Sequence, residues 1–216
     1  MIRYVSFHNG NISSELIAMQ KAVMDTFNIP IEQIQSDLLH GTAIDKFLEE
    51  EPWDLLVLFD IDCIPLRWNE GYIGNIGLEP FNRKLFGAPQ RANHIPDSKD
   101  YASPAFMVLR KELYETIGKP SFEPTHRGDC AEEISYGCRD KGILIEYLDV
   151  MHVDQPYWSL EDGTPFGYGT TFGNLFIEVN HAFESRANHF STDNFYMKIK
   201  NTHIILETFT VNDQLG

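Results

Sequence analysis

Two carboxylates at the end of an apolar run are the residues of this chain best suited to chemistry. Residues 55–59 are all apolar, and Asp60, Ile61 and Asp62 follow them directly. Because side chains alternate along a strand, Asp60 and Asp62 share a face and can reach one hard cation, whose free positions take phosphate oxygens. A strand that simply ends in a polar turn is the alternative, since Asp is common there. The apolar run before the pair and Pro65 after it favour the metal interpretation.

The elements before this pair alternate between strand and helix patterns. Residues 4–7 predict a first strand, a helix begins near Ser13, and residues 31–35 predict a second, short strand. Thr42, with Asp45 three residues later, predicts the start of a second helix. This order predicts an α/β fold with a mostly parallel central sheet covered by helices on both faces. Ligands of such sheets lie beyond the carboxyl ends of the strands.

A second acidic cluster follows a strand predicted at 105–110 and a short helix predicted at 111–117. Asp129, after Gly128, stands at the head of a predicted helix, with Glu132 and Glu133 in its first turns. Acidic residues at a helix start are often only favourable partners of the helix dipole. A carboxylate placed within about 3 Å of a hydroxyl can also remove its proton.

The last third of the chain combines one more strand pattern with a glycine-rich stretch. Residues 143–150 predict a strand, and His152 follows it. Residues 162–174 hold four glycines among aromatic residues, which predicts a mobile flap. The stretch contains a Gly-x-Gly, but no helix pattern follows it closely, so a dinucleotide-binding fingerprint is excluded.

Composition narrows the class of protein. The 216 residues suit a single domain, 1–216, with 43% hydrophobic residues to form its core. A net charge of -15 and the lack of clustered Lys and Arg argue against a nucleic-acid partner. The three cysteines form no Cys-x-x-Cys, so neither a disulfide framework nor a structural zinc site is predicted. No apolar stretch is long enough for a signal peptide or membrane span, and a cytoplasmic protein is expected.

The order of these parts over roughly residues 1 to 190 resembles glycosyltransferases of the GT-A fold, of family-2 type. The resemblance is carried by five segments: Tyr4-Val5-Ser6-Phe7, Asp60-Ile61-Asp62-Cys63-Ile64-Pro65, Ser103-Pro104-Ala105-Phe106-Met107, Gly128-Asp129, and Gly142-Ile143-Leu144-Ile145-Glu146-Tyr147 leading to His152. At Gly128 the chain departs from the pattern, because inverting members often carry Glu there.

The resemblance implies a metal-dependent hexosyltransferase that uses a nucleotide-sugar donor. A divalent metal, usually Mn²⁺ and alternatively Mg²⁺, would hold the donor diphosphate, and a UDP-sugar is the expected donor. Asp62 would bind the metal directly, and Asp60 would act on the ribose side or through water. The acceptor would be a saccharide or another hydroxyl compound. The implied division is a nucleotide-sugar half at about 1–65, an acceptor half at about 66–190, and a C-terminal segment at 191–216.

The same resemblance places the catalytic base of an inverting reaction at Asp129. Glu132 and Glu133, one helical turn away, stay as alternatives. It also implies that a histidine completes the metal site. His152 fits by its position after a strand and is preferred, while His181, after the glycine-rich stretch, is the competing ligand.

Further residues are assigned to substrate binding. Arg186 either faces the diphosphate or is a solvated charge. Tyr157 and Trp158 either form an acceptor platform, because sugar faces stack on aromatic rings, or cover the core. Donor binding is assigned to residues at the ends of the first strands, namely Ser6, Phe7, His8 and Asp37.

Two other functions fit parts of the pattern. A catalytically weak sugar-nucleotide or glycan-binding module is compatible with the departure at Gly128. A phosphatase of the haloacid-dehalogenase type also places Asp-x-Asp after an apolar strand. The phosphatase fits less well, because its motif usually lies near the chain start, whereas here the motif follows the third predicted strand.

Overall fold

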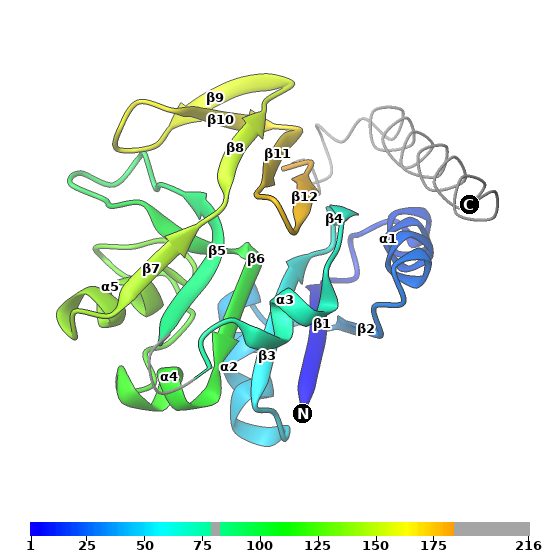
Figure 1. Ribbon diagram of the computed structural model, residues 1–216, viewed down its shortest axis with the longest axis horizontal. Helices are drawn as coiled ribbons and strands as arrows, with labels where there is room; N and C mark the ends of the chain where they lie inside the picture. The colour runs from blue at the N-terminus through cyan, green and yellow to red at the C-terminus, as the bar shows by residue number, and fades with distance from the viewer. Residues whose placement is uncertain (79–82, 184–216) are drawn as a thin grey trace.

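The computed structural model describes residues 1–78 and 83–183, and a six-stranded sheet forms its centre. The strand order is β2-β1-β3-β6-β5-β7 (Figure 1). The bounds are β1 Ile2–His8, β2 Ile31–Gln35, β3 Leu55–Asp60, β5 Lys84–Gln90, β6 Tyr101–Arg110 and β7 Leu144–Tyr147. Strand β6 is antiparallel to β3 and β5, and the other pairs are parallel. The predicted mostly parallel α/β sheet is confirmed.

Helices cover both faces of this sheet. One face packs against α2 (His40–Glu50), α4 (Lys111–Thr116) and α5 (Glu132–Asp140). The other face packs against α3 (Glu70–Asn75) and the end of α1 (Ser14–Thr26). The β3 side chains that supply both cores are nearly all buried, as expected for a strand covered on two sides.

Helix α1 follows its sequence signals closely. The Ser13 side chain accepts a hydrogen bond from the backbone N–H of Leu16, which satisfies one of the free donors at the helix start. Leu16, Met19 and Val23 form a buried stripe that packs on the segment after β3. The helix therefore lies directly against the chain that carries Asp60 and Asp62.

The start predicted for α2 is wrong by two residues, for a tertiary reason. The helix begins at His40, and its N-cap residue Leu39 makes no side-chain cap bond. Thr42 donates instead to the Glu123 carboxylate, and Asp45 accepts from the Ser121 hydroxyl and a backbone N–H. Both side chains of the expected capping box thus hold the 121–123 segment against the helix.

Two smaller sheets lie at the carboxyl ends of the parallel strands (Figure 1). A four-stranded sheet has the order β4-β12-β11-β8, and a hairpin joins β9 and β10. The bounds are β4 Cys63–Arg67, β8 Asp149–His152, β9 Gln155–Ser159, β10 Pro165–Tyr168, β11 Thr170–Gly173 and β12 Glu178–His181.

These small sheets change two expectations. The strand predicted at 143–150 is two strands, because the chain leaves the central sheet after β7 and joins the four-stranded sheet as β8. The glycine-rich stretch predicted as a flap contains β10 and β11 and is hydrogen-bonded on both sides. Arg186 and the segment 191–216 lie outside the described residues. In the part of the chain that is described, no helix has both the length and the apolar character needed to cross a membrane.

Candidate metal centre

The turn between β3 and β4 presents two carboxylates at the carboxyl end of a central strand. Asp60 is the last residue of β3, and Asp62 lies in the turn with only 1% of its surface exposed. The two residues therefore do not share one face of a strand, as the sequence suggested, but are brought together by the turn. A carboxylate as buried as Asp62 needs a compensating charge or hydrogen bonds.

His181, on β12 and 119 residues further along the chain than Asp62, supplies the third group. Strand β12 pairs with β4 so that His181 lies opposite Cys63, and the backbone N–H of Ala182 donates to the Asp62 carbonyl at 3.0 Å. His181 Nε2 lies 3.2 Å from Asp62 Oδ1 and 3.4 Å from Asp60 Oδ2. The ligand atoms of the three residues lie within 4.8 Å of one another. Within the ranges 1–78 and 83–183, no other group of three such residues is as close.

The charge balance of this cluster depends on the carboxylates. Burial alone would lower the pKa of His181, but the charges and hydrogen bonds of Asp62 and Asp60 outweigh it and raise the pKa to about 9. The cluster thus attracts a positive charge into a buried place. Two carboxylates and an imidazole form a donor set that suits a divalent cation such as Mn²⁺, so the residues fit a metal. Burial and the same two carboxylates raise the pKa of the Cys63 thiol, which keeps it protonated.

Gln20 on α1 holds the turn in place. Its side-chain amide is fully buried and donates to the backbone carbonyls of Asp60, at 2.7 Å, and Cys63, at 3.0 Å. Gln33 in turn donates to the Gln20 side-chain oxygen at 3.0 Å. These contacts fix both ends of the segment that carries the carboxylates. A glutamine on a helix stripe carries no sequence signal for such a role.

A second histidine lies close to Asp60. His40, the first residue of α2, places Nε2 3.7 Å from Asp60 Oδ1, and its ring contacts Phe7 with centroids 6.3 Å apart. Sequence reasoning missed His40, because the helix was expected to begin at Thr42. His152, the ligand preferred from sequence, is exposed on β8, and its Nε2 lies 3.0 Å from Asp154 Oδ1. The geometry therefore favours His181 over His152 as the third ligand.

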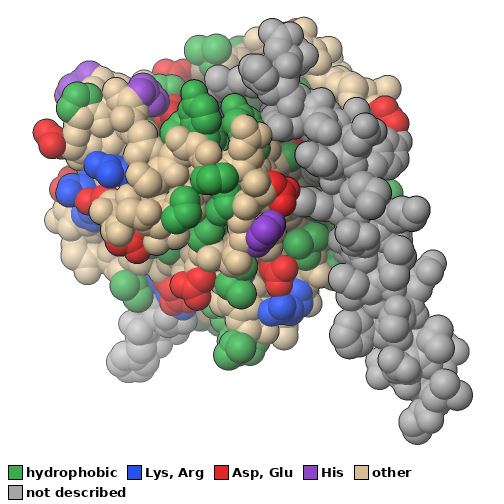
Figure 2. Space-filling model, turned by 90° about the horizontal axis from the view of Figure 1, so that it is seen from above, with side chains coloured by type: hydrophobic (Ala, Val, Ile, Leu, Met, Phe, Trp, Pro, Cys, Tyr) green, Lys and Arg blue, Asp and Glu red, His purple; other side chains and the backbone are tan. Residues whose placement is uncertain are grey.

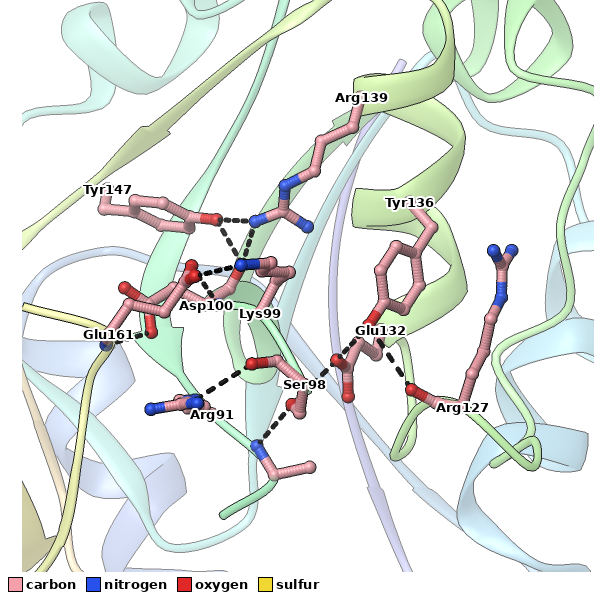
Figure 3. Close-up of polar contacts among 11 residues, drawn as sticks. Arg91, Ser98, Lys99, Asp100, Arg127, Glu132, Tyr136, Arg139, Tyr147 and Glu161 are labelled. Carbon is pink, nitrogen blue, oxygen red and sulfur yellow. Dashed lines mark hydrogen bonds and ion pairs between the residues drawn. The ribbon is translucent and has the colours of Figure 1, made fainter. Parts of the chain in front are cut away.

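In the acidic cluster near α5, the carboxylate of Glu132 is held by hydrogen bonds within the fold. Glu132 is completely buried and accepts hydrogen bonds from the Ser98 and Tyr136 hydroxyls, both at 3.0 Å (Figure 3). It also accepts one from the backbone N–H of Asp129 at 2.9 Å. A Cβ atom at Gly128 would lie 3.0 Å from the Glu132 Cβ. Gly128 thus leaves the space in which Glu132 packs.

The other two carboxylates differ in how they are held. Glu133 accepts hydrogen bonds from Thr125 at 2.7 Å and from Arg127 at 2.9 and 2.5 Å. The hydrogen bond from Arg127 is the largest cause that lowers the Glu133 pKa, and the one from Thr125 lowers it further. Asp129 is half-buried in a turn before α5, which begins three residues later than its predicted head. One Asp129 oxygen accepts from the backbone N–H of Cys130 at 2.8 Å. Of the three, Asp129 is held by the fewest of these contacts.

Tyr101 is influenced by the charges of both acidic groups. It is buried as the first residue of β6, and its hydroxyl donates to Gln90 at 3.4 Å. Burial raises the pKa of this phenol first, and the charges of Asp129 and Asp60 both raise it further. Tyr101 therefore lies within electrostatic range of both Asp60 and Asp129.

The residues assigned to donor binding lie in β1 or beyond β2 and differ in exposure. Phe7 is in register with Asp60 on the neighbouring strand and is buried. Ser6 is fully buried, and its hydroxyl has no hydrogen-bond partner among the described residues. His8 is half-buried at the end of β1, and Asp37 is exposed beyond β2.

No family model and no curated protein sequence matches the chain. Among solved structures, A197 from STIV is similar at a TM-score of 0.43 and 15% identity, over 80% of this chain and 94% of that one. The mannosyltransferase PcManGT from Pyrobaculum calidifontis, in complex with GDP-Man and Mn²⁺, is similar at a TM-score of 0.47 and 10% identity. The match covers 68% of this chain and 54% of that one. A Bacillus anthracis protein assigned as a glucose-1-phosphate thymidylyltransferase, in complex with sucrose, is similar at a TM-score of 0.40 and 9% identity. The match covers 69% of this chain and 87% of that one. At these scores the likeness carries no inference about activity.

Proposed function

We propose that this chain is a metal-dependent glycosyltransferase that transfers a sugar from a nucleoside-diphosphate sugar to an acceptor hydroxyl. The observation that carries the proposal is the buried set of Asp60, Asp62 and His181 at the carboxyl end of β3. Such a donor set at the carboxyl edge of an α/β sheet is suited to a cation that in turn binds a diphosphate.

Each residue of the site has its own proposed role in binding the cation. Asp62 and His181 would hold the cation from the turn and from β12, and Asp60 would face it from the end of β3. A bound metal neutralises negative charge on the leaving diphosphate as a Lewis acid. His40 Nε2 lies 3.7 Å from Asp60 Oδ1, which is too far for a direct hydrogen bond.

Asp129 is the proposed base of an inverting transfer. Glu132 is buried among three donors, and Glu133 is paired with Arg127, so both are poorly placed to accept a proton from an acceptor. One oxygen of Asp129 is held by the backbone N–H of Cys130, which leaves the other as the proton acceptor.

The proposal is tested by incubating the purified chain with UDP-glucose, UDP-N-acetylglucosamine and GDP-mannose and measuring release of the nucleoside diphosphate. Release should require Mn²⁺ or Mg²⁺ and should stop with a chelator. Asp62→Asn should abolish it, whereas Asp140→Asn, the same charge change at an exposed position at the end of α5, should not.

Other outcomes would assign a different function. Hydrolysis of p-nitrophenyl phosphate without release from any nucleotide sugar would indicate a phosphatase. Metal-dependent binding of a nucleotide sugar in calorimetry, with no turnover, would indicate a binding module. A wild-type chain that binds neither metal nor nucleotide sugar would refute the proposed site altogether.

A further inference from the structure

An open hollow lies on the β9–β10 hairpin, outside the metal centre. It has a volume of about 440 Å³ and is lined by Asn93, Pro156, Tyr157, Trp158 and Ser159. Tyr157 is 67% exposed, although it is one of the largest apolar side chains of the hairpin. We propose that this hollow is a saccharide-binding subsite that holds the acceptor of the transfer reaction; the acceptor role, but not saccharide binding itself, rests on the proposed function.

A bulge in the hairpin places two aromatic rings together. Along a regular strand Tyr157 and Trp158 would point to opposite faces. The register shifts between Phe166 and Gly167, so that Trp158 pairs with Phe166 and Pro156 with Gly167, and Tyr157 is the extra residue. Bulges of this kind re-aim a side chain. The rings of Tyr157 and Trp158 accordingly meet with centroids 4.9 Å apart.

Gly167 permits the bulge. A Cβ atom at this position would stand 2.3 Å from the Gln155 carbonyl oxygen and 2.7 Å from the Tyr157 nitrogen. Any side chain here would push the two strands apart, so the close approach requires glycine. The aromatic pair therefore depends on a specific backbone arrangement rather than on two exposed rings that meet by chance.

The hollow is anchored firmly to the rest of the molecule. The Asn93 side chain donates to the Ser159 carbonyl at 2.8 Å and accepts from the Ser159 N–H at 3.3 Å. Beyond the strand, Glu161 and Asp100 exchange two backbone-to-carboxylate hydrogen bonds, at 2.9 and 3.1 Å (Figure 3). Arg139 and Tyr147 both donate to the Asp100 carbonyl. A rigid aromatic surface loses little conformational entropy when a ligand binds.

The chemistry of the lining favours a neutral, hydroxyl-rich ligand. None of the five lining residues carries a charge, although the chain has a net charge of -15. Figure 2 looks onto this end of the molecule and shows several hydrophobic side chains exposed on the face, with acidic side chains among and around them. Aromatic faces with a few amide and hydroxyl groups suit the apolar face and hydroxyl groups of a sugar ring.

The hollow is also connected to the metal centre through rings. Trp158 contacts Phe183 with centroids 5.6 Å apart, and Phe183 contacts His181 with centroids 3.8 Å apart. One aromatic ring therefore separates the hollow from the third metal ligand. A saccharide held by Tyr157 and Trp158 would lie beside the centre that binds the donor, as an acceptor must.

The test is calorimetric titration of the wild-type chain with three neutral probes, mannotriose, cellotriose and chitotriose, with and without Mn²⁺ and UDP. At least one should bind, and Tyr157→Ala should weaken its affinity by about tenfold, as expected when an exposed aromatic anchor is truncated. Phe176→Ala is the matched control, because it removes a ring that is 46% exposed and lies in the turn between β11 and β12. Circular dichroism of each variant verifies that it is folded.

The outcomes separate this subsite from the proposed function. Trisaccharide binding that depends on Tyr157, in a chain that binds no nucleotide sugar, would support the saccharide site and refute the transferase. Release of nucleoside diphosphate with no trisaccharide binding under any condition would overturn the subsite alone. Equal affinity of wild type and Tyr157→Ala, or binding of phosphatidylcholine vesicles in place of the sugars, would also overturn it.

Discussion

Replacing Gln20 by Met tests whether helix α1 controls the metal centre. Met has a similar length and leaves no large cavity, but it cannot donate to the carbonyls of Asp60 and Cys63. These two hydrogen bonds, at 2.7 and 3.0 Å, tie the backbone at both ends of the turn to α1. We expect Gln20→Met to fold and to bind metal more weakly.

The magnitude follows from the bonds that are lost. Each hydrogen bond contributes about 1 kcal/mol net, and a buried carbonyl left without a partner adds to the loss, so the free energy of unfolding should fall by about 2–4 kcal/mol. A domain stable by about 5–15 kcal/mol stays folded after such a change. Groups that support metal ligands from outside typically affect metal affinity by about 10- to 100-fold.

The assay pairs urea unfolding with Mn²⁺ calorimetry at pH 7. Gln33→Met is the matched control, because it removes the donors to Gln20 and to the Ile17 carbonyl but leaves the two bonds to the turn. If Gln20→Met loses stability but binds Mn²⁺ like wild type, Gln20 only stabilises the fold. Equal weakening in both variants would likewise refute the positioning role.

Three further predictions concern catalysis, packing and pH. Asp129→Asn should keep donor and metal affinity in calorimetry but lower transfer by about 10²- to 10⁴-fold, and full activity would exclude Asp129 as base. Gly41→Ala should lower the free energy of unfolding by about 1–3 kcal/mol, because its Cβ would stand 2.5 Å from a backbone oxygen. Gly74→Ala is the control and should not lower it, because the nearest atom to its Cβ would be 3.9 Å away. Equal denaturation midpoints of the two variants would contradict the prediction. The Arg127 contact lowers the Glu133 pKa below 4.5, so the stability that ionised Glu133 contributes is present above that pH and is lost as pH falls through the folded pKa. The difference in unfolding free energy between wild type and Glu133→Gln should therefore shrink from about pH 6 to about pH 3. A constant difference would disprove the linkage.

Most of the central sheet was predictable because its signals are local. Strand β5 was not predicted, because it lies in the stretch 68–99, whose Gly, Asn and Pro residues are typical of loops. Residues 31–35 form β2 as expected, and Ser13 caps α1 as its position before the apolar stripe indicates. The buried run before Asp60 reads as a covered strand and is one. Periodicity and capping depend on neighbours within a few residues, so the sequence contains them directly.

The parts that could not be predicted depend on distant contacts. Thr42 and Asp45 match a capping box, yet residues 121–123 compete for both side chains. The order of His152 and His181 along the chain does not show which one approaches Asp62, because the pairing of β4 with β12 decides it. That pairing has no local signature.

The pairing of β4 with β12 also has a consequence for how the molecule assembles. Asp62 and His181 are 119 residues apart, so the contact between them closes a long loop. The six central strands all lie before residue 148 and can pair before β12 joins β4. Long-range strand pairing is slow and costs loop-closure entropy, so we expect His181 to reach Asp62 late in folding. A cation bound by both ends of this loop would act as a non-covalent crosslink, which stabilises the last sheet to form.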